Sequence, residues 1–313
     1  MGNEEIAIKT EGLRKVFGRF RKRIVAVKEL NMEIERSTIH GFIGPNGAGK
    51  TTTIKMLVGA IRPTKGKAFI FDEPVGSVKA KRYIGYSPEH PNFYPMSAID
   101  FLIYMGRISG MKREEARKRA KELMEWIGLE GFENKNAQRF SAGMKQKLSI
   151  VQALIHDPDI LILDEPTANL DPIGRFEVIG KIGELARKER KTVFISSHIL
   201  YELEKIVDHV TIIKRGNVLL QSSIASLRKR FSENHFIIDT SSNKQFIKRL
   251  EGIGNVKKVW INHEGKIEVN VSNGERFKKE LIDLVKNSNI IMNEFSPYKM
   301  SLENIFIKLV ESE

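Results

Sequence analysis

The chain has 313 residues, 41% of them hydrophobic, so it can bury a full core and has room for one large domain and one small domain. Its formal net charge is +13, and it contains no cysteine, which excludes disulfides, thiolate metal sites and cysteine nucleophiles. We find no secretory signal in residues 1–9 and no run of about eighteen uncharged apolar residues, so we predict a protein that stays inside the cell and does not cross a bilayer.

The first part of the chain is predicted to alternate buried strands with helices. Apolar, partly β-branched runs that indicate parallel strands lie at 38–43, 160–163 and 192–195. Helical patterns follow or separate them at 50–58, 143–155 and 176–189. This order predicts an α/β domain over residues 1–225, in which helices cover a parallel sheet. Helical patterns at 98–108 and 113–127 predict a helical subdomain inserted at about residues 90–145.

The character of the chain changes from about residue 226. Strands are predicted at 235–240, 256–261, 266–271 and 290–294, and helices at 244–250 and 275–286. Their order, β-α-β-β-α-β, is the ferredoxin-like arrangement, so we predict a small α+β domain over residues 226–313. A last helix is predicted at 302–310.

A glycine-rich segment stands between the first predicted strand and the first predicted helix. It reads Gly44, Pro45, Asn46, Gly47, Ala48, Gly49, Lys50 and Thr51, with Thr52 next, and fits the phosphate-loop pattern G-x-x-x-x-G-K-[ST]. Glycines let successive N–H groups point at one anion, and the helix that follows adds its positive end. We predict that Lys50 reaches the β and γ phosphates and that the Thr51 hydroxyl contacts Mg²⁺.

The strand predicted at 160–163 ends in two adjacent carboxylates, Asp164 and Glu165. Carboxylates at the end of a buried strand are costly unless a cation or a water network meets them. A magnesium nucleotide satisfies that need. Asp164 is predicted to hold the metal through water, and Glu165 to orient or deprotonate the attacking water.

A second helix start with anion-binding character lies at Ser141 and Gly143. Ser141 is a natural N-cap, and Gly143 leaves the first amide groups uncovered. One nucleotide needs only one phosphate cradle, so this helix start is predicted to serve the nucleotide of a neighbouring protomer. An ordinary capped helix is the alternative interpretation.

Together these motifs resemble the nucleotide-binding subunit of an ABC transporter, and the resemblance extends over the whole chain. It implies a head-to-tail dimer that sandwiches two ATP molecules, with Ser141 and Gly143 acting in trans. It also implies that Phe17 stacks on adenine, that the segment Asn169-Leu-Asp171 communicates across the interface, and that His198 contacts the γ phosphate. Core packing of Phe17 and a structural role for His198 remain alternatives.

The sequence departs from the common pattern of this family in three places. Glu89 stands where the family usually has glutamine, so its contact to magnesium or water would be anionic, a variant that resembles the exporter branch. The signature segment reads Phe-Ser-Ala-Gly-Met at 140–144 rather than Leu-Ser-Gly-Gly-Gln, and Phe17 replaces a more frequent tyrosine. We expect trans binding and base stacking to survive these changes.

The resemblance implies an ATP- and Mg²⁺-dependent ATPase. It implies a homodimer, or a pair with a related ATPase subunit, that drives separate transmembrane permease subunits from the cytoplasmic face of the membrane, with export as the direction. Alternatives are a soluble ABC ATPase acting on nucleic acid or ribosomes, which the net charge of +13 would suit, and a nucleotide-gated module that no longer turns over. Residues 227–313 are predicted to be regulatory, dimer-bracing or partner-contacting.

Overall fold

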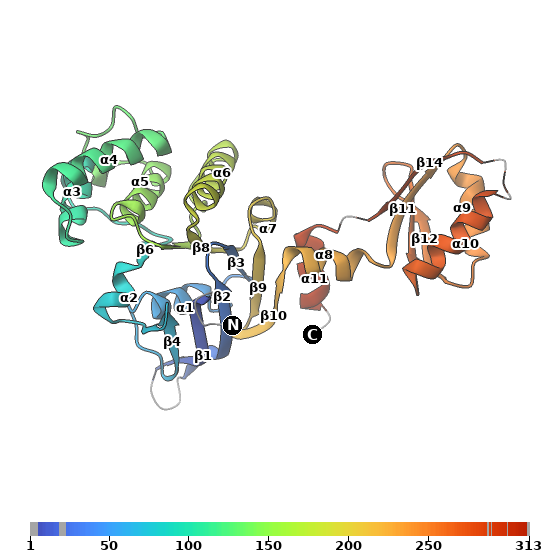
Figure 1. The fold of residues 1–313 in the computed structure, drawn as a ribbon, viewed down its shortest axis with the longest axis horizontal. Coiled ribbons are helices and arrows are strands. Elements are labelled where there is room, and N and C mark those ends of the chain that lie inside the picture. Colours follow the sequence, from blue (N-terminus) through green and yellow to red (C-terminus); the bar gives the residue numbers. More distant parts are fainter. Residues whose placement is uncertain (1–5, 19–22, 287, 289, 299, 312–313) are drawn as a thin grey trace. The chain divides into compact units, whose positions relative to one another are not determined.

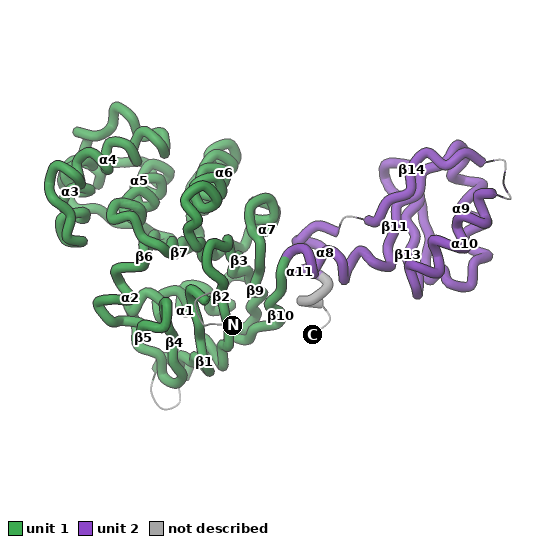
Figure 2. Tube along the Cα trace, in the orientation of Figure 1, with its two compact units in different colours: residues 1–223 green, residues 224–313 purple. Residues whose placement is uncertain are grey.

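The computed structural model describes residues 6–18, 23–286, 288, 290–298 and 300–311, without the side chains of residues 308–311. Residues 1–5, part of the segment predicted to carry no secretory signal, lie outside the described residues. The chain divides into two compact units, residues 1–223 and residues 224–313 (Figure 2). Each unit has a sheet of its own.

The sheet of unit 1 is ten-stranded, in the order β5-β4-β1-β2-β10-β9-β3-β8-β7-β6. Its strands are β1 (Ile6–Phe17), β2 (Ile24–Glu35), β3 (Ile39–Ile43), β4 (Lys65–Ile70), β5 (Glu73–Pro74), β6 (Ile84–Ser87), β7 (Ile160–Asp164), β8 (Thr192–Ser197), β9 (His209–Lys214) and β10 (Asn217–Ser223). From β9 to β6 neighbouring strands pair in parallel. The carboxyl ends of these strands therefore meet at one edge, where ligands of such sheets bind.

The three strands predicted from apolar runs are β3, β7 and β8, and every residue in them is buried. The helices of unit 1 are α1 (Lys50–Leu57), α2 (Val78–Arg82), α3 (Ala98–Ile108), α4 (Arg113–Ile127), α5 (Ala142–Leu154), α6 (Pro172–Glu189) and α7 (Leu200–Leu203), with a 3₁₀ turn η2 (Ala137–Arg139). Helix α6 begins at Pro172 rather than at residue 176. The Asp171 carboxylate accepts an N–H from Gly174 at 2.7 Å and so caps the helix, and proline suits the first helical position.

Helices α3 and α4 lie in the part predicted to be helical near residues 90–145, and α5, which was predicted as a helix of the α/β pattern, lies with them (Figure 1). Ser97 caps α3 by accepting the Asp100 N–H, and α4 ends at Gly128 in the left-handed region. A Cβ built on Gly106 would lie 2.8 Å from the Cβ of Ala116, so glycine is what lets α3 and α4 approach. Among the described residues, no helix has both the length and the apolar character needed to cross a bilayer.

The antiparallel part of unit 1 was not predicted from the sequence. Strand β1 pairs antiparallel with β2 and with β4, and the β1–β2 register shifts between Thr10 and Leu13 and again nearby. Such irregularities break the two-residue alternation that marks a strand in sequence. The strands are nevertheless well anchored, because Ile8, Leu13 and Leu30 are fully buried, each worth about 1.5–3 kcal/mol of transfer free energy.

Unit 2 has the predicted ferredoxin-like arrangement. Its antiparallel sheet has the order β12-β13-β11-β14. The elements are α8 (Ile224–Ser232), β11 (His235–Thr240), α9 (Asn243–Glu251), β12 (Val256–Ile261), β13 (Ile267–Val271), α10 (Gly274–Lys286), β14 (Met292–Pro297) and α11 (Leu302–Glu311). Phe246 of α9 and Phe277 of α10 share one core with Phe236 and Val269 of the sheet, so both helices cover the same face. Strand β14 was predicted at 290–294, and α8 was not predicted.

Candidate nucleotide-binding site

Residues 44–49 form a loop that joins β3 to α1 at the carboxyl edge of the parallel strands. Gly49 has φ 109°, in the left-handed region that favours glycine. A Cβ at Gly44 would lie 2.3 Å from the carbonyl oxygen of Ile213, and one at Gly49 would lie 2.5 Å from that of Ala26. The loop is therefore pressed against β9 and β2, and this close approach leaves no room for a Cβ at either position.

Lys50 is the first residue of α1 and is 6% exposed. Its Nζ donates to the carbonyl oxygen of Gly44 at 2.7 Å and lies 3.1 Å from Oε1 of Glu165. A buried ammonium thus stands between the loop and the end of β7. A triphosphate seated in the loop would meet this charge at its β and γ groups.

Asp164 ends β7 and is fully buried. Its Oδ1 accepts from Ser196 Oγ at 2.7 Å and from Thr51 Oγ1 at 3.4 Å, whereas Oδ2 has no hydrogen-bond partner among the described residues. Burial raises the pKa of the Asp164 carboxyl, and the charges of Glu89 and Glu165 raise it further, against the lowering effect of the hydroxyl hydrogen bonds. The buried oxygen is suited to a cation that lowers this cost.

The carboxylate of Glu165 lies between a cation and an imidazole. Its Oε2 is 2.8 Å from Nδ1 of His198 and accepts the His198 backbone N–H at 3.3 Å, while Oε1 faces Lys50. The Ser196 hydroxyl accepts the Glu165 N–H at 3.0 Å. Glu165 also has φ 47°, a strained conformation for a residue with a Cβ, which persists only where its surroundings enforce it.

Glu89 lies in the loop after β6, with its side chain 36% exposed. Its charge is one of those that raise the pKa of Asp164, and it acts likewise on Tyr86. Burial, followed by the charges of Asp164 and Glu89, raises the pKa of Tyr86 to about 12. Glu89 is therefore close enough to Asp164 for its charge to act on that carboxyl.

Ser141, Gly143 and Asp171 gather around a different hollow of ≈ 490 Å³. The Ser141 hydroxyl caps α5 by accepting the Met144 N–H at 3.2 Å, and a Cβ at Gly143 would lie 3.3 Å from the carbonyl oxygen of Asn169. None of the described residues that line this hollow belongs to the loop at 44–51. The structure thus separates the two predicted anion sites within one chain.

Phe17 is the last residue of β1, and its ring is 41% exposed. The ammonium of Lys15 lies 5.1 Å from the ring centroid. The ring is therefore not enclosed in the core and is partly accessible to solvent.

Two residues near Asp164 and Glu165 belong to the site but were not predicted from the sequence. Ser196 orients both Asp164 and the Glu165 backbone, and Tyr86 lies in the field of Asp164 and Glu89. The only sequence signal for Ser196 is a polar residue at the end of an apolar strand, which is common to many sheets. Its role depends on its hydrogen bond to Asp164, a residue of the neighbouring strand that lies 32 positions earlier in the chain.

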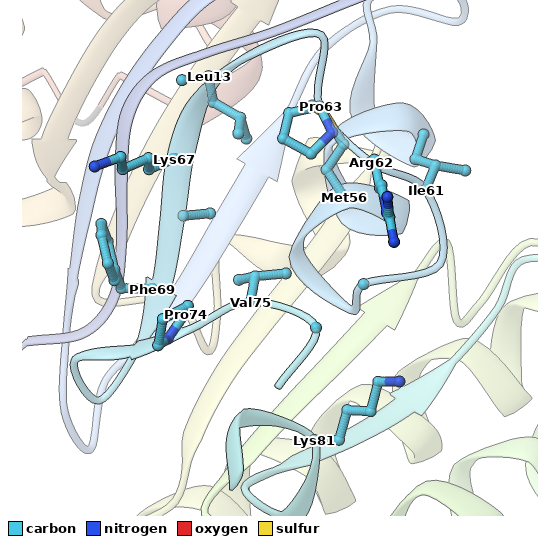
Figure 3. Close-up of a pocket in the computed structure, with 14 residues that line it drawn as sticks. Leu13, Met56, Ile61, Arg62, Pro63, Lys67, Phe69, Pro74, Val75 and Lys81 are labelled. Carbon is cyan, nitrogen blue, oxygen red and sulfur yellow. The ribbon is translucent and has the colours of Figure 1, made fainter. Parts of the chain in front are cut away.

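A larger hollow of ≈ 680 Å³ lies elsewhere in unit 1, beside β4 and β5 (Figure 3). Leu13, Phe69 and Val75 line it together with the cationic side chains of Lys67 and Lys81. None of the predicted site residues is among the described residues that form its walls. The size of a hollow therefore does not locate the chemistry of this protein.

A glycine-rich loop between a buried parallel strand and a helix, with a lysine and an acidic strand end at the same edge, defines a nucleotide-binding protein of the phosphate-loop class. Comparison with known proteins narrows this class. Residues 27–168 match the family model described as ABC transporter, and residues 223–310 match the C-terminal domain of the DrrA1-3-like ATP-binding proteins.

Full-length relatives agree with these matches. The bacitracin transport ATP-binding protein BcrA of Bacillus licheniformis is 38% identical over 97% of this chain and 97% of its own length. The linearmycin resistance ATP-binding protein LnrL of Bacillus subtilis is 30% identical over 96% of this chain and 97% of its own length. The chain belongs to the family of ABC transporter ATP-binding proteins.

Solved structures give the same result for the fold. A dimeric ATP-binding cassette in a post-hydrolysis state, bound to ADP and Pi, has a TM-score of 0.65 and 25% identity, covering 69% of this chain and 98% of that one. The chain is thus an ATP-binding subunit of an ABC transporter and an ATPase. Family, fold class and ATPase activity, as predicted from the sequence, are confirmed.

The raised pKa of Asp164 has a consequence for stability. The folded protein holds this proton to higher pH than the unfolded chain, so stability falls as pH rises from the ordinary value of 3.8 through the raised one and stays reduced above it. We expect Asp164→Asn to raise the Tm of the nucleotide-free protein at neutral pH by about 2–4 °C while removing Mg²⁺-dependent hydrolysis.

Thermal melts and ATPase assays of the same preparation check this expectation. Asp72→Asn, at an exposed turn residue with φ 65° that asparagine tolerates, is the control and should change neither quantity. A Tm of Asp164→Asn that falls, or Mg²⁺-dependent turnover that persists, would contradict the role given to the buried carboxylate.

Proposed function

We propose that this ATPase works as one half of an ATP-closed dimer, a homodimer or a pair with a related subunit, that drives a separate transmembrane permease at the cytoplasmic face of the membrane. The observation that carries the proposal is the separation of two anion sites in one chain: the hollow around Ser141 and Gly143 contains no residue of the loop at 44–51 among the described residues. A head-to-tail pair brings the two sites together. Residues 1–225 then form the ATPase domain, and residues 226–313 form an accessory domain.

In this proposal residues 44–52 hold the triphosphate of one ATP molecule. Lys50 contacts the β and γ phosphates, Phe17 stacks on the adenine, and His198 contacts the γ phosphate. The exposed ring of Phe17 and the position of His198 at the end of β8 support these roles. Ser141, Gly143 and Asp171 of one protomer complete the site of the other.

Magnesium fits the oxygen groups at the end of β7. Asp164 Oδ2 is buried without a partner among the described residues, Oδ1 accepts a hydrogen bond from the Thr51 hydroxyl, and Glu89 adds a nearby negative charge. Carboxylate and hydroxyl oxygens are the ligands that Mg²⁺ prefers, usually with waters and phosphate oxygens. When bound, the ion would neutralise phosphate charge during transfer.

Glu165 is the proposed general base. In the present arrangement Oε1 faces Lys50 and Oε2 faces His198. A triphosphate in the loop draws Lys50 toward its phosphates, which leaves Oε1 free to orient a water and accept its proton. His198 and the Ser196 hydroxyl keep the carboxylate and its backbone in place meanwhile.

Export is the proposed direction. The Glu89 variant, the C-terminal match to DrrA1-3-like proteins, and the bacitracin transport and linearmycin resistance relatives all support it. The proposed partners are membrane subunits rather than nucleic acid, although the net charge is +13.

The test is to search the neighbouring genes for one that encodes an integral membrane protein and to co-express that protein with this chain. We expect the chain to remain in the membrane fraction only when that partner is present and its ATPase rate to change in proteoliposomes that contain the partner. Absence of any membrane association, together with RNA binding that weakens steeply as salt rises, would instead favour a soluble ATPase acting on nucleic acid.

A further inference from the structure

The buried side chain of Glu202 joins segments that flank the acidic pair. It lies on α7, four residues after His198, and is 5% exposed. Its Oε2 accepts the hydroxyl of Thr167 at 2.7 Å, and Thr167 comes two residues after Glu165. The segment that follows Glu165 is therefore tied to the helix that follows His198.

The second oxygen of Glu202 reaches α6. Arg175 Nη1 lies 3.2 Å from Glu202 Oε1, and Arg175 Nε donates to the carbonyl oxygen of Leu170 at 2.8 Å. Leu170 in turn lies beside the signature segment, since a Cβ at Gly143 would be 3.2 Å from Leu170 Cδ2. One carboxylate thus holds the start of the loop at 166–171 directly and its end through Arg175.

Burying the Glu202 carboxylate costs folding free energy unless both of its oxygens have hydrogen-bond partners. A buried carboxylate is tolerated only when charge-assisted hydrogen bonds satisfy it, and here each oxygen has one. Glu165, with φ 47°, also needs neighbours that hold its backbone. The bonds made by Glu202 constrain the chain on both sides of the Glu165–His198 contact of 2.8 Å.

We propose that Glu202 is a positioning residue for ATP hydrolysis: it holds Glu165 and His198 in register and fixes the loop that carries Asp171. The proposal rests on the roles proposed above for Glu165 and His198. Glu202 reaches neither the phosphate loop nor Asp164 through any hydrogen bond of the described residues, so it acts through its neighbours. Displacing a general base by about 1 Å costs on the order of 10²-fold in rate.

The experiment measures kcat, KM and nucleotide affinity for the full-length chain with Glu202→Gln and Arg175→Gln, singly and together. We expect each single change to lower kcat about 10–100-fold, with KM and ATP affinity within about twofold of wild type. Because Glu202 and Arg175 belong to one hydrogen-bonded pair, the double variant should lose no more of kcat than the more damaging single variant.

Thr167→Val and Thr167→Ser give a second test if Glu202→Gln fails to fold. Loss of the hydroxyl should lower kcat, and the serine, which restores it, should recover most of the rate. Lys191→Gln is the matched control, since Lys191 is a similarly buried charged side chain whose 2.8 Å ion pair reaches the exposed Asp157. Lys191 precedes β8, at the opposite end of that strand from Ser196. The Lys191→Gln change should leave kcat unchanged.

The inference is overturned if Glu202→Gln and Thr167→Val both keep kcat within about twofold of wild type, or if Lys191→Gln lowers kcat as much as they do. A parallel assay of Glu165→Gln distinguishes failure of the positioning role of Glu202 from failure of the catalytic role of Glu165. If that variant is inactive and the Glu202 and Thr167 variants are normal, only the positioning role fails. If the Glu165→Gln variant hydrolyses ATP at the normal rate, Glu165 is not the general base, and the positioning role of Glu202 fails as well.

Discussion

Replacing Glu165 with glutamine is expected to leave ATP bound, to stop its hydrolysis, and to trap the chain as an ATP-containing dimer. Glutamine keeps the size of the side chain and can still accept from the His198 imidazole, but it cannot take a proton from water. Removal of a general base costs about 10²–10⁴-fold in rate. The Lys50 ammonium loses its 3.1 Å carboxylate partner and remains available to the phosphates.

Size-exclusion chromatography with and without ATP, run beside an ATPase assay, checks both parts of this expectation. The matched control is Glu177→Gln, an exposed carboxylate on α6, which should hydrolyse ATP normally and show no stable dimer. A Glu165→Gln protein that stays monomeric with ATP and hydrolyses it at the wild-type rate would contradict both the proposed general base and the proposed dimer.

The core of the site could be predicted because its signals are local in sequence. The loop before Lys50 is a contiguous pattern, and Asp164 and Glu165 end an apolar run. His198 follows another such run, and the parallel pairing of β7 with β8 sets the two strand ends side by side. General rules for open parallel sheets place such strand ends at one edge.

The supports of the site could not be predicted, because they join residues distant in sequence. Ser196 meets Asp164, and Glu202 meets Thr167 and Arg175, only after β7, β8 and α6 have packed. A serine or glutamate near a strand end carries no signal of the partner it will meet.

The antiparallel strands were missed for a different reason. The pairing of β1 with β2 is interrupted by register shifts, so the burial along β1 does not alternate cleanly. The sequence does contain a signal for the start of α6, since Asp171 followed by Pro172 is an N-cap followed by a proline at the first helical position.

Mixing two inactive variants is expected to restore ATPase activity if each site is built from two chains. Lys50→Ala disables the phosphate loop, and Ser141→Arg blocks the signature hollow with bulk and positive charge. Every homodimer of either variant then contains only damaged sites. A mixed dimer contains one site with both defects and one site with neither, because the loop of one chain faces the signature segment of the other.

The number of intact sites in the mixture sets the maximum ATPase rate that mixing can restore. With equal amounts and random pairing, half of the dimers are mixed and one of their two sites is intact, so activity should return to at most about a quarter of wild type. The control mixes Lys50→Ala with Glu165→Gln, which both damage the phosphate-loop side and leave no intact site. Recovery in that control would show that mixing restores activity without an intact pairing of loop and signature segment, so a quarter-rate result would no longer support the shared site. No recovery with Ser141→Arg would place both anion sites in the service of one chain and exclude the shared site, because the hollow at Ser141 would then have no role in the nucleotide site of a partner.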